Sequence, residues 1–563
     1  MRYPDDQLTP QERARLAPYV TDLDGPVFAL VGLPETVKAA LFARYSRHPG
    51  TLRRLFIDEF AESLPEGGAY DDAEGDRAAQ LYERIFVGYG DDSVAQLGGA
   101  HVACEWVSNV LTKVLQRPRL GSYLEQSTRY IAYDQRTPGG AYRYWHDPAE
   151  LGPRYAAAMD NLFDEYSRML GVMQAWVADR HPRGNGEPEA AHARAVKAKT
   201  FDICRGLLPA ASLSHMGIYA SGQAYEQLIL HLFAHPLPEA RDYGRMLLRE
   251  LKHVIPSFLT RIERADRGDA WVDHLKARRA AERSVAERFG LATGDQESDA
   301  YVKLLSYSGD ERDLIAAMLF ESGALSEIDA RARLDGLGRD QIAALGRELV
   351  GERGNRRHRP GRGYERLRYR FEVVSDYGAF RDIQRHRMLT IQWQDLTPDL
   401  GADVPEEIEA AGLGGDYRRA LEGSAAEYER LVDCGMPEAA VYALCLQYKI
   451  RYVLDLNARE AMHLIELRSG REGHPGYRQV AHDMHRQIAE QHPTVAASMT
   501  HVDLEASPRL ERIDSETRTQ VRLERAGRNF AREPGAAEPA AEEDGAADDE
   551  DASNADRLFP AVG

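Results

Sequence analysis

The sequence has 563 residues, of which 43% are hydrophobic and 29% charged, and its formal net charge is −19. These values are typical of a globular chain with two or more domains, and they exclude a protein that is basic overall for binding nucleic acid. The sequence has no apolar run of the roughly 18 residues that a membrane span needs and no apolar signal core at its start, so we expect a cytoplasmic protein. Its four cysteines include no CxxC pair, which argues against a disulfide framework and against a structural zinc site.

Hydrophobic periodicity predicts helices in the first half of the chain. Residues 100–117 place their apolar side chains on one helical stripe, and Pro118 should end that helix. Residues 238–264 and 271–289 have helical patterns as well. The sequence Thr-Gly-Asp at 293–295 then indicates a break between two halves.

In the second half, helical patterns resume at 312–350 and recur at 436–468. Between them, residues 368–380 have the pattern of a strand that leads into a helix. Near the end, residues 533–556 contain ten Asp or Glu and no Lys or Arg. Because such a composition cannot bury apolar surface, we expect a disordered acidic tail there.

Two arginine triplets indicate an internal duplication. Arg117-Pro118-Arg119 and Arg385-His386-Arg387 lie 268 residues apart, which is about one domain length, and each follows a helix-like segment. The duplication predicts two related halves, at residues 1–290 and 300–515, followed by a tail at 530–563.

The segment RPRLGSYLEQSTRY, from residue 117, resembles the signature R-H-R-x-x-S-x-N-E-x-S-x-R-Y of the flavin-dependent thymidylate synthases. Pro118 stands in place of the signature's His and Leu124 in place of its Asn. By the resemblance the Arg-His-Arg triplet contacts the flavin, so Pro118 argues against flavin binding at this copy. The matching positions are Arg117, Arg119, Ser122, Glu125, Ser127, Arg129 and Tyr130. The resemblance implies that these residues bind the nucleotide, with Ser127 and Arg129 at its phosphate and Glu125 as an orienting acceptor. Arginine forks and serine hydroxyls are good partners for a phosphate dianion.

A second motif of the first half is CRGLLP at 204–209, which resembles the family's A-R-x-x-L-P. The resemblance implies that Arg205 is a further phosphate arginine. Counted onward from Arg205 without a gap, Ser221 and Leu232 stand where the family has an Asn and an Arg.

The second half has the complementary pattern. Its triplet Arg385, His386 and Arg387 is intact, and Glu365 lies where the family has a flavin-site Glu. The segment NAREAMHLIELR at 457–468 resembles N-x-R-x-L-x-x-x-L-x-L-R. By this resemblance Asn457 contacts the flavin, whereas Arg468 reaches the uracil and acts as the catalytic residue. The phosphate motif is lost, because the positions of its Glu, Ser and two Arg hold Trp393, Asp395, Thr397 and Val441.

Helical geometry supports the pairing of Asn457 with Arg468. If residues 457–468 form one helix, eleven residues make about three turns, so the two side chains point the same way within about 20°. Arg459 would then point nearly opposite, toward the surface or an interface. The alternative is a plain amphipathic core helix with Arg468 at a favourable C-terminal end.

The resemblance therefore implies an α+β fold of two tandem, helix-rich domains. The function that it implies is reductive methylation of dUMP to dTMP, with methylenetetrahydrofolate, reduced FAD and NADPH as the reductant. Each family site is built from several subunits of a homotetramer. A composite site across the two halves, in a homodimer that mimics the tetramer, follows as a hypothesis.

Two alternatives stay open at this point. The first is an altered or inactive relative of the family that binds flavin or a nucleotide. The second is nucleic-acid binding through residues 353–370, where many arginines accompany Tyr364 and Tyr369.

Overall fold

The computed structural model describes residues 8–24, 28–35, 37–38, 41–42, 51–61, 96–137, 140–147, 150–292, 299–505 and 509–530. The chain forms two compact units, which are described separately. The first unit contains the chain up to Gln126 together with Leu213–Gly294, and the second contains Ser127–Ser212 and the chain from Asp295. The predicted break at 293–295 and the acidic tail beyond residue 530 lie outside the described residues.

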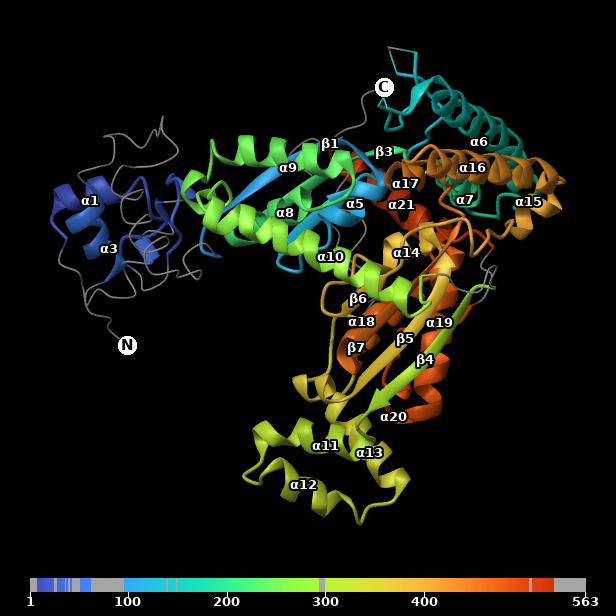
Figure 1. Ribbon diagram of the computed structural model, residues 1–563. Coiled ribbons are helices and arrows are strands. Elements are labelled where there is room, and N and C mark those ends of the chain that lie inside the picture. Colours follow the sequence, from blue (N-terminus) through green and yellow to red (C-terminus); the bar gives the residue numbers. More distant parts are fainter. Residues whose placement is uncertain are drawn as a thin grey trace. The chain divides into compact units, whose positions relative to one another are not determined.

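The first unit is built on an antiparallel sheet of three strands in the order β1-β3-β2, namely β1 (Gly99–Ser108), β2 (Gly121–Glu125) and β3 (Leu213–Ser221) (Figure 1). Helix α8 packs on α9 and α10, and α9 also contacts α5. Their bounds are α5 (Asn109–Leu115), α8 (Gly222–Phe233), α9 (Pro238–Leu251) and α10 (Ala270–Arg288). Shorter elements of this unit are α1 (Pro10–Leu16), α3 (Leu52–Leu55), η1 (Phe56–Phe60), η6 (Pro256–Leu259) and η7 (Ala265–Asp269).

The second unit contains an antiparallel sheet of four strands in the order β4-β5-β7-β6 (Figure 1). The strands are β4 (Tyr301–Ser308), β5 (Arg368–Asp376), β6 (Thr390–Trp393) and β7 (Lys449–Asn457). Helix α19 (Pro475–Gln491) packs against β4 and β5 and contacts α14 (Tyr377–Ile383) and α18 (Ala458–Arg468). This arrangement brings the ends of α14 and α18, where the predicted flavin and uracil motifs lie, to the same helix.

Further helices of the second unit pack on one another. Helix α6 packs against α7 and α16, and α21 packs against α7; they span α6 (Gly152–Arg180), α7 (Glu189–Cys204), α16 (Gly414–Asp433) and α21 (Ile513–Phe530). A small cluster of α11 (Glu311–Leu319), α12 (Glu327–Leu334) and α13 (Arg339–Val350) is held by Ile315, Leu334 and Ile342. The remaining short elements are η5 (Arg205–Leu207), η8 (Phe320–Ser322), η9 (Arg362–Arg366), α15 (Glu406–Ala410), α17 (Pro437–Ala440), η10 (Val441–Ala443) and α20 (Pro493–Ala497). Of the helices in the described ranges, none combines the length and apolarity that a bilayer crossing requires.

The two sheets repeat one pattern, as the predicted tandem duplication requires. In one copy β1 leads into α5, an arginine triplet and β2, and later β3 leads into α8; in the other, β5, α14, the second triplet, β6, β7 and α18 follow in the same order. The later strand, β3 or β7, lies between the other two. Each strand-to-helix junction has a side-chain cap on a backbone N–H three residues on, supplied by Ser108, Ser221, Asp376 and Asn457.

Within the second unit, equivalent segments of the two copies pair across a local pseudo-twofold axis. The amide of Ala210 donates to the carbonyl of Leu444 at 2.7 Å, and the amide of Leu446 donates to the carbonyl of Leu208 at 2.9 Å. Positions 208 and 444, like 210 and 446, are equivalent in the two copies, because both pairs are separated by the 236 residues that separate β3 from β7. The exchange is therefore reciprocal, as in an isologous interface between two subunits. It explains why residues 127–212 belong to a compact unit with the second copy, although the predicted repeat boundary lies near residue 290.

Several predicted elements differ from the structure. The helix predicted at 100–117 is wrong, since residues 99–108 form β1 and only 109–115 are helical. The helix at 436–468 is wrong in its middle, where β7 alternates buried Tyr452, Leu454 and Leu456 with half-exposed neighbours, a period of two that marks a strand. The 238–264 helix ends at Leu251, and 312–350 divides into three helices. The helix at 271–289 and the strand-to-helix pattern at 368–380 are confirmed.

Candidate functional site

Arg129 connects the phosphate motif of the first copy to the second copy. Its Nε and Nη2 donate to the two carboxylate oxygens of Asp202, each at 2.6 Å, and its Nη1 donates to the hydroxyl of Tyr477 at 2.9 Å. Nη2 also donates to the carbonyl of Glu472 at 2.9 Å. The amide of Arg129 in turn donates to Ser127 Oγ at 3.2 Å. Such a bidentate pair fixes the plane of the guanidinium.

Tyr477 lies between two arginines that were assigned to different motifs. Its ring centroid is 5.7 Å from Arg129 Cζ and 5.4 Å from Arg468 Cζ. The tyrosine is buried and belongs to α19. One aromatic side chain therefore joins the predicted phosphate arginine to the predicted uracil arginine, and all three residues belong to the second unit.

Arg205 is the most deeply buried arginine of this group. Arg205 is the first residue of η5, directly after α7. It is 3% exposed, and its Nη1 is 3.5 Å from Asp382 Oδ2. Its Nη2 is buried and has no hydrogen-bond partner among the residues that the structure describes. The close approach depends on Gly378, where an added Cβ would lie 3.3 Å from that Nη2. A buried guanidinium donor without an acceptor is costly, so the position suits an anionic ligand.

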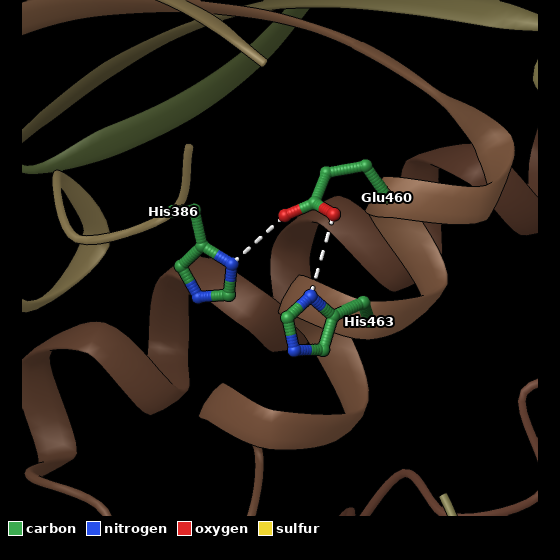
Figure 2. Close-up of side chains that lie close together, drawn as sticks. All are labelled: His386, Glu460 and His463. Carbon is green, nitrogen blue, oxygen red and sulfur yellow. Dashed lines mark hydrogen bonds and ion pairs between the residues drawn. The ribbon is translucent and has the colours of Figure 1, made fainter. Parts of the chain in front are cut away.

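His386 is fixed by the partners of both its ring nitrogens. Figure 2 shows its Nδ1 directed at Glu460, with 3.0 Å between Nδ1 and Oε1. On the other side, Arg468 Nε donates to His386 Nε2 at 3.1 Å. The second carboxylate oxygen of Glu460 is 3.3 Å from His463 Nδ1. Burial lowers the pKa of His386 to about 4, so the ring is neutral at pH 7.

Positive charge dominates the space around these residues. Burial alone would raise the pKa of Asp382, but the charges of Arg385, Arg205 and Arg468 outweigh it and hold that pKa below its usual range. Asp202 is likewise buried, and the charge and hydrogen bonds of Arg129 lower its pKa despite the burial. Arg512 adds a further cation, at 3.5 Å from Asp202 Oδ2 and over the ring of Tyr130. The carboxylates therefore stay ionised and hold the arginines in place, while the group as a whole attracts anions.

Four residues of the predicted nucleotide motif belong to the first unit, whereas this group belongs to the second. Arg117, Arg119 and Ser122 are exposed at and before β2. Glu125 is buried at the end of β2, where it accepts from Lys113 Nζ at 3.0 Å and Gln116 Nε2 at 2.8 Å. The structure thus brings together Ser127, Arg129, Arg205, Arg385, His386 and Arg468 in the second unit. The roles of the residues in the first unit stay predictions.

The other predicted flavin residues of the second unit occupy different places. Asn457 is the N-cap of α18, and its side chain accepts from the amide of Glu460 at 2.9 Å. Glu365 pairs with Arg362 at 3.2 Å on η9 and is 3.8 Å from Arg459. Arg387 is exposed in the turn after α14. Because Asn457 precedes the helix and does not form part of it, the helical-phase argument for Asn457 and Arg468 does not apply as stated.

Sequence reasoning missed the residues that organise the arginines. They are Asp202, Asp382, Glu460, His474, Tyr477 and Arg512. None of them lies at a motif position that carried the resemblance. An acidic residue in a helical pattern usually faces solvent, so only its burial in the fold distinguishes it. Glu460 gave a partial signal, because it lies inside the recognised 457–468 segment.

Two further groups of residues bear on the alternatives. Cys104, Cys204 and Cys445 are buried, and burial raises the pKa of each thiol to about 12, so none of these three is a thiolate nucleophile at pH 7. Tyr364 and Tyr369, which were considered for stacking on nucleic-acid bases, are buried and bonded to Ser498 and His492. Their rings are therefore not available for stacking, and that part of the nucleic-acid interpretation is wrong.

Comparison with known proteins gave matches over most of the chain. The model of the family described as thymidylate synthase complementing protein matches twice, at residues 37–257 and 303–494. A UPF0159 protein of Chlamydia muridarum is 35% identical over 525 residues, covering 91% of this chain and 98% of the relative. UPF0159 protein Ta1429 of Thermoplasma acidophilum is 31% identical, covering 86% of this chain and 99% of the relative. Among solved structures, a UMP/dUMP methylase of Streptomyces cacaoi bound with 5-Br dUMP is similar at 20% identity and a TM-score of 0.30, covering 37% of this chain and 97% of that one.

Proposed function

We propose, from the premise that this chain belongs to the thymidylate synthase complementing protein family, that it methylates dUMP reductively to dTMP at a composite site. One observation carries the proposal. Arg129 and Arg205 from the first copy and Arg385, His386 and Arg468 from the second belong to one compact unit, and Tyr477 contacts both Arg129 and Arg468. Each copy alone lacks part of the family's motifs, and this unit combines the phosphate arginines of the first copy with the triplet and the uracil arginine of the second.

The phosphate end of the substrate would lie at Arg205. Its buried Nη2 needs an acceptor, and a phosphate dianion supplies several. Asp382 and Asp202 are already engaged by arginines, so they leave a net positive environment for the nucleotide. The uracil end would lie at Arg468, whose guanidinium stabilises negative charge at N3 and O2 of the ring.

The residues of the second triplet fit a flavin. Arg385 and Arg387 are exposed in the turn after α14, where their guanidinium groups suit the diphosphate of FAD. Bound FAD would supply the hydride chemistry, with NADPH as the reductant and methylenetetrahydrofolate as the source of the methylene. The high pKa of the three buried cysteines agrees with a reaction that uses no cysteine nucleophile.

A second candidate is an altered relative that binds flavin or a nucleotide without methylating it. The contacts of Arg129 favour this candidate. Its Nε and Nη2 are taken by Asp202 and by the carbonyl of Glu472, and one Nη1 hydrogen by Tyr477, so this arginine has little capacity left for a phosphate. In the altered relative, Arg129 would join the two copies and only Arg205 would hold the anion.

The experiment that separates the two candidates starts with the purified full chain. An active synthase is yellow or takes up added FAD, its reduced flavin is reoxidised when dUMP and methylenetetrahydrofolate are present, and its gene rescues a thymidine auxotroph. A colourless protein that rejects FAD contradicts both the flavin and the synthase proposals. If the site is composite, Arg129→Ala or Arg387→Ala alone should abolish activity. Wild-type activity in either variant would contradict the composite site. A homodimer that mimics the family tetramer predicts twice the chain mass in sedimentation.

A further inference from the structure

Glu460, His386 and Arg468 form a continuous chain of hydrogen bonds. Glu460 Oε1 is 3.0 Å from His386 Nδ1, and Arg468 Nε is 3.1 Å from His386 Nε2. Glu460 and His386 are buried, and Figure 2 shows them facing each other, with Glu460 on α18 and His386 on the turn that follows α14. Nothing in the family motif quoted above assigns a role to Glu460.

Only one protonation pattern gives each of these two hydrogen bonds one donor and one acceptor. The Nε–H of an arginine can only donate, so His386 Nε2 must carry a lone pair. Because the imidazole is neutral, its proton is on Nδ1, where the Glu460 carboxylate accepts it. Burial acts to raise the pKa of Glu460, but the hydrogen bonds from His386 and His463 outweigh it and lower that pKa to about 2, so the carboxylate is ionised.

A metal site is the other interpretation of the same residues. Donor atoms of His386, Glu460 and His463 lie within 4.8 Å of one another, and two histidines with a carboxylate are a common ligand set. An ion on His386 Nδ1 would move the ring proton to Nε2, where it would face the Arg468 Nε–H at 3.1 Å. Two donors would then oppose each other beside a guanidinium charge. The observed contacts therefore favour the hydrogen-bonded series Glu460–His386–Arg468, which we call the relay, over a metal centre.

The first copy lacks the whole relay. Pro118 stands in place of His386, and the 236-residue offset between the later strands and helices puts Ala224 in place of Glu460 and Leu232 in place of Arg468. The structure supports this offset, because Ser221 and Asn457 cap α8 and α18 in the same way. Residues that function only as a set are expected to be lost together, and the first copy lacks all three members of the relay.

We infer that Glu460 and His386 are positioning residues that fix the guanidinium plane of Arg468, and so determine how it meets the pyrimidine of a uridine nucleotide. The inference rests on the proposed function for the identity of the ligand. His386 engages Nε of Arg468, and Tyr477 is a further hydrogen-bond partner of the same guanidinium. The hydrogens that remain on the terminal nitrogens are the ones that can meet a ligand. A parallel pair of donors suits the N3–O2 edge of an ionised uracil, and its orientation decides the strength of both bonds.

The tautomer of His386 tests the relay without any ligand. In protein labelled with ¹⁵N-histidine, the His386 signals, assigned by their loss in His386→Asn, should show a protonated Nδ1 and an unprotonated Nε2 at pH 7. Glu460→Leu removes the acceptor and should shift the ring toward the Nε2-protonated form. Glu460→Gln serves if that variant does not fold. Glu466→Gln changes a buried glutamate on the same helix that pairs with Arg353, and it should leave the His386 signals in place. A wild-type ring protonated on Nε2 overturns the relay.

Binding measurements with two ligands distinguish a failure of the relay from a failure of the proposed function. Glu460→Leu should weaken binding of dUMP about tenfold and leave binding of 2-deoxyribose 5-phosphate unchanged, because only dUMP has the ring that Arg468 meets. Equal loss of both ligands overturns the positioning role. A wild-type protein that binds neither ligand overturns the proposed function, while the tautomer still decides for or against the relay. Added Co²⁺ that gives a ligand-field spectrum lost in His463→Ala overturns the relay in favour of the metal site.

Discussion

Arg129 and Tyr477 lie 348 positions apart in the chain, and the Nη1 of Arg129 donates to the hydroxyl of Tyr477 at 2.9 Å. The contact joins the phosphate motif of the first copy to the helix that follows the uracil motif of the second. It is reinforced by the bidentate pair of Arg129 with Asp202. In a duplicated chain, this is the kind of contact that a homo-oligomer makes between subunits.

Arg129→Lys should lower the free energy of unfolding by about 2–4 kcal/mol, because a lysine cannot keep both bonds to the buried Asp202 and leaves that carboxylate poorly paired. Urea unfolding measures the change. The matched control is Arg136→Lys, since Arg136 pairs with Asp160 at 3.3 Å on the surface, and this variant should change the stability far less than Arg129→Lys does. Equal effects of the two variants would show that the Arg129 pair is not structural.

Arg205→Met should weaken dUMP binding by about 10- to 100-fold, which corresponds to the roughly 1.5–3 kcal/mol of a hydrogen bond to a charged group. The reason is that its buried Nη2 is the donor that lacks an acceptor. Titration calorimetry with dUMP and with deoxyuridine checks this, because binding of the nucleoside, which has no phosphate, should not change. Arg261→Met, which breaks a pair with Glu226 in the first unit, is the control variant. If Arg205→Met binds dUMP as the wild type does, Arg205 is not a phosphate ligand.

Local patterns predicted the duplication and most motif positions, because those depend on residue type and spacing alone. The equivalence of Asn457 with Ser221, counted without a gap, is supported by the matching helix caps. The strands β1 and β7 were missed because a short buried strand and a helix have similar apolar content. Inside 100–117, no Gly or Pro marks the point where the strand ends and the helix begins.

The candidate site was predictable only in part, for a different reason. The arginines follow from motifs, whereas the carboxylates and the tyrosine that hold them come from distant parts of the chain. Asp202 meets Arg129 across 73 positions, and His386 meets Glu460 across 74. Pairings at such separations are decided by tertiary packing, which one sequence does not contain. The compact unit of residues 127–212 with the second copy also follows from pairing of equivalent segments, and not from a boundary signal.

Stability should fall as the pH decreases from about 6.5 to about 4. In the folded protein the pKa of His386 is lowered to about 4 by burial, while the unfolded chain has the ordinary value near 6.5. The unfolded state therefore takes up the proton first, so the stability present above pH 6.5 is lost as the pH falls through 4, by about 3 kcal/mol from this residue. His474, whose pKa burial lowers to about 3, acts in the same direction.

Urea unfolding at several pH values measures this dependence. His386→Asn should have a shallower loss of stability between pH 6.5 and 4 than the wild type, because an asparagine does not titrate. His231→Asn is the control, at an exposed histidine of α8 in the first unit. Parallel curves for His386→Asn and the wild type would show that His386 is not buried in neutral form.

One uridine nucleotide should bind per chain, although the chain contains two copies. The first copy has Pro118, Ala224 and Leu232 where the second has His386, Glu460 and Arg468, so it lacks every member of the relay. Calorimetric titration with dUMP should therefore give a stoichiometry near one. Pro118→His should leave it unchanged, because a single histidine finds neither the carboxylate nor the guanidinium that orient it in the second copy. A stoichiometry of two in the wild type would contradict the assignment of one competent site, and a rise from one to two in Pro118→His would show that the triplet alone makes a site.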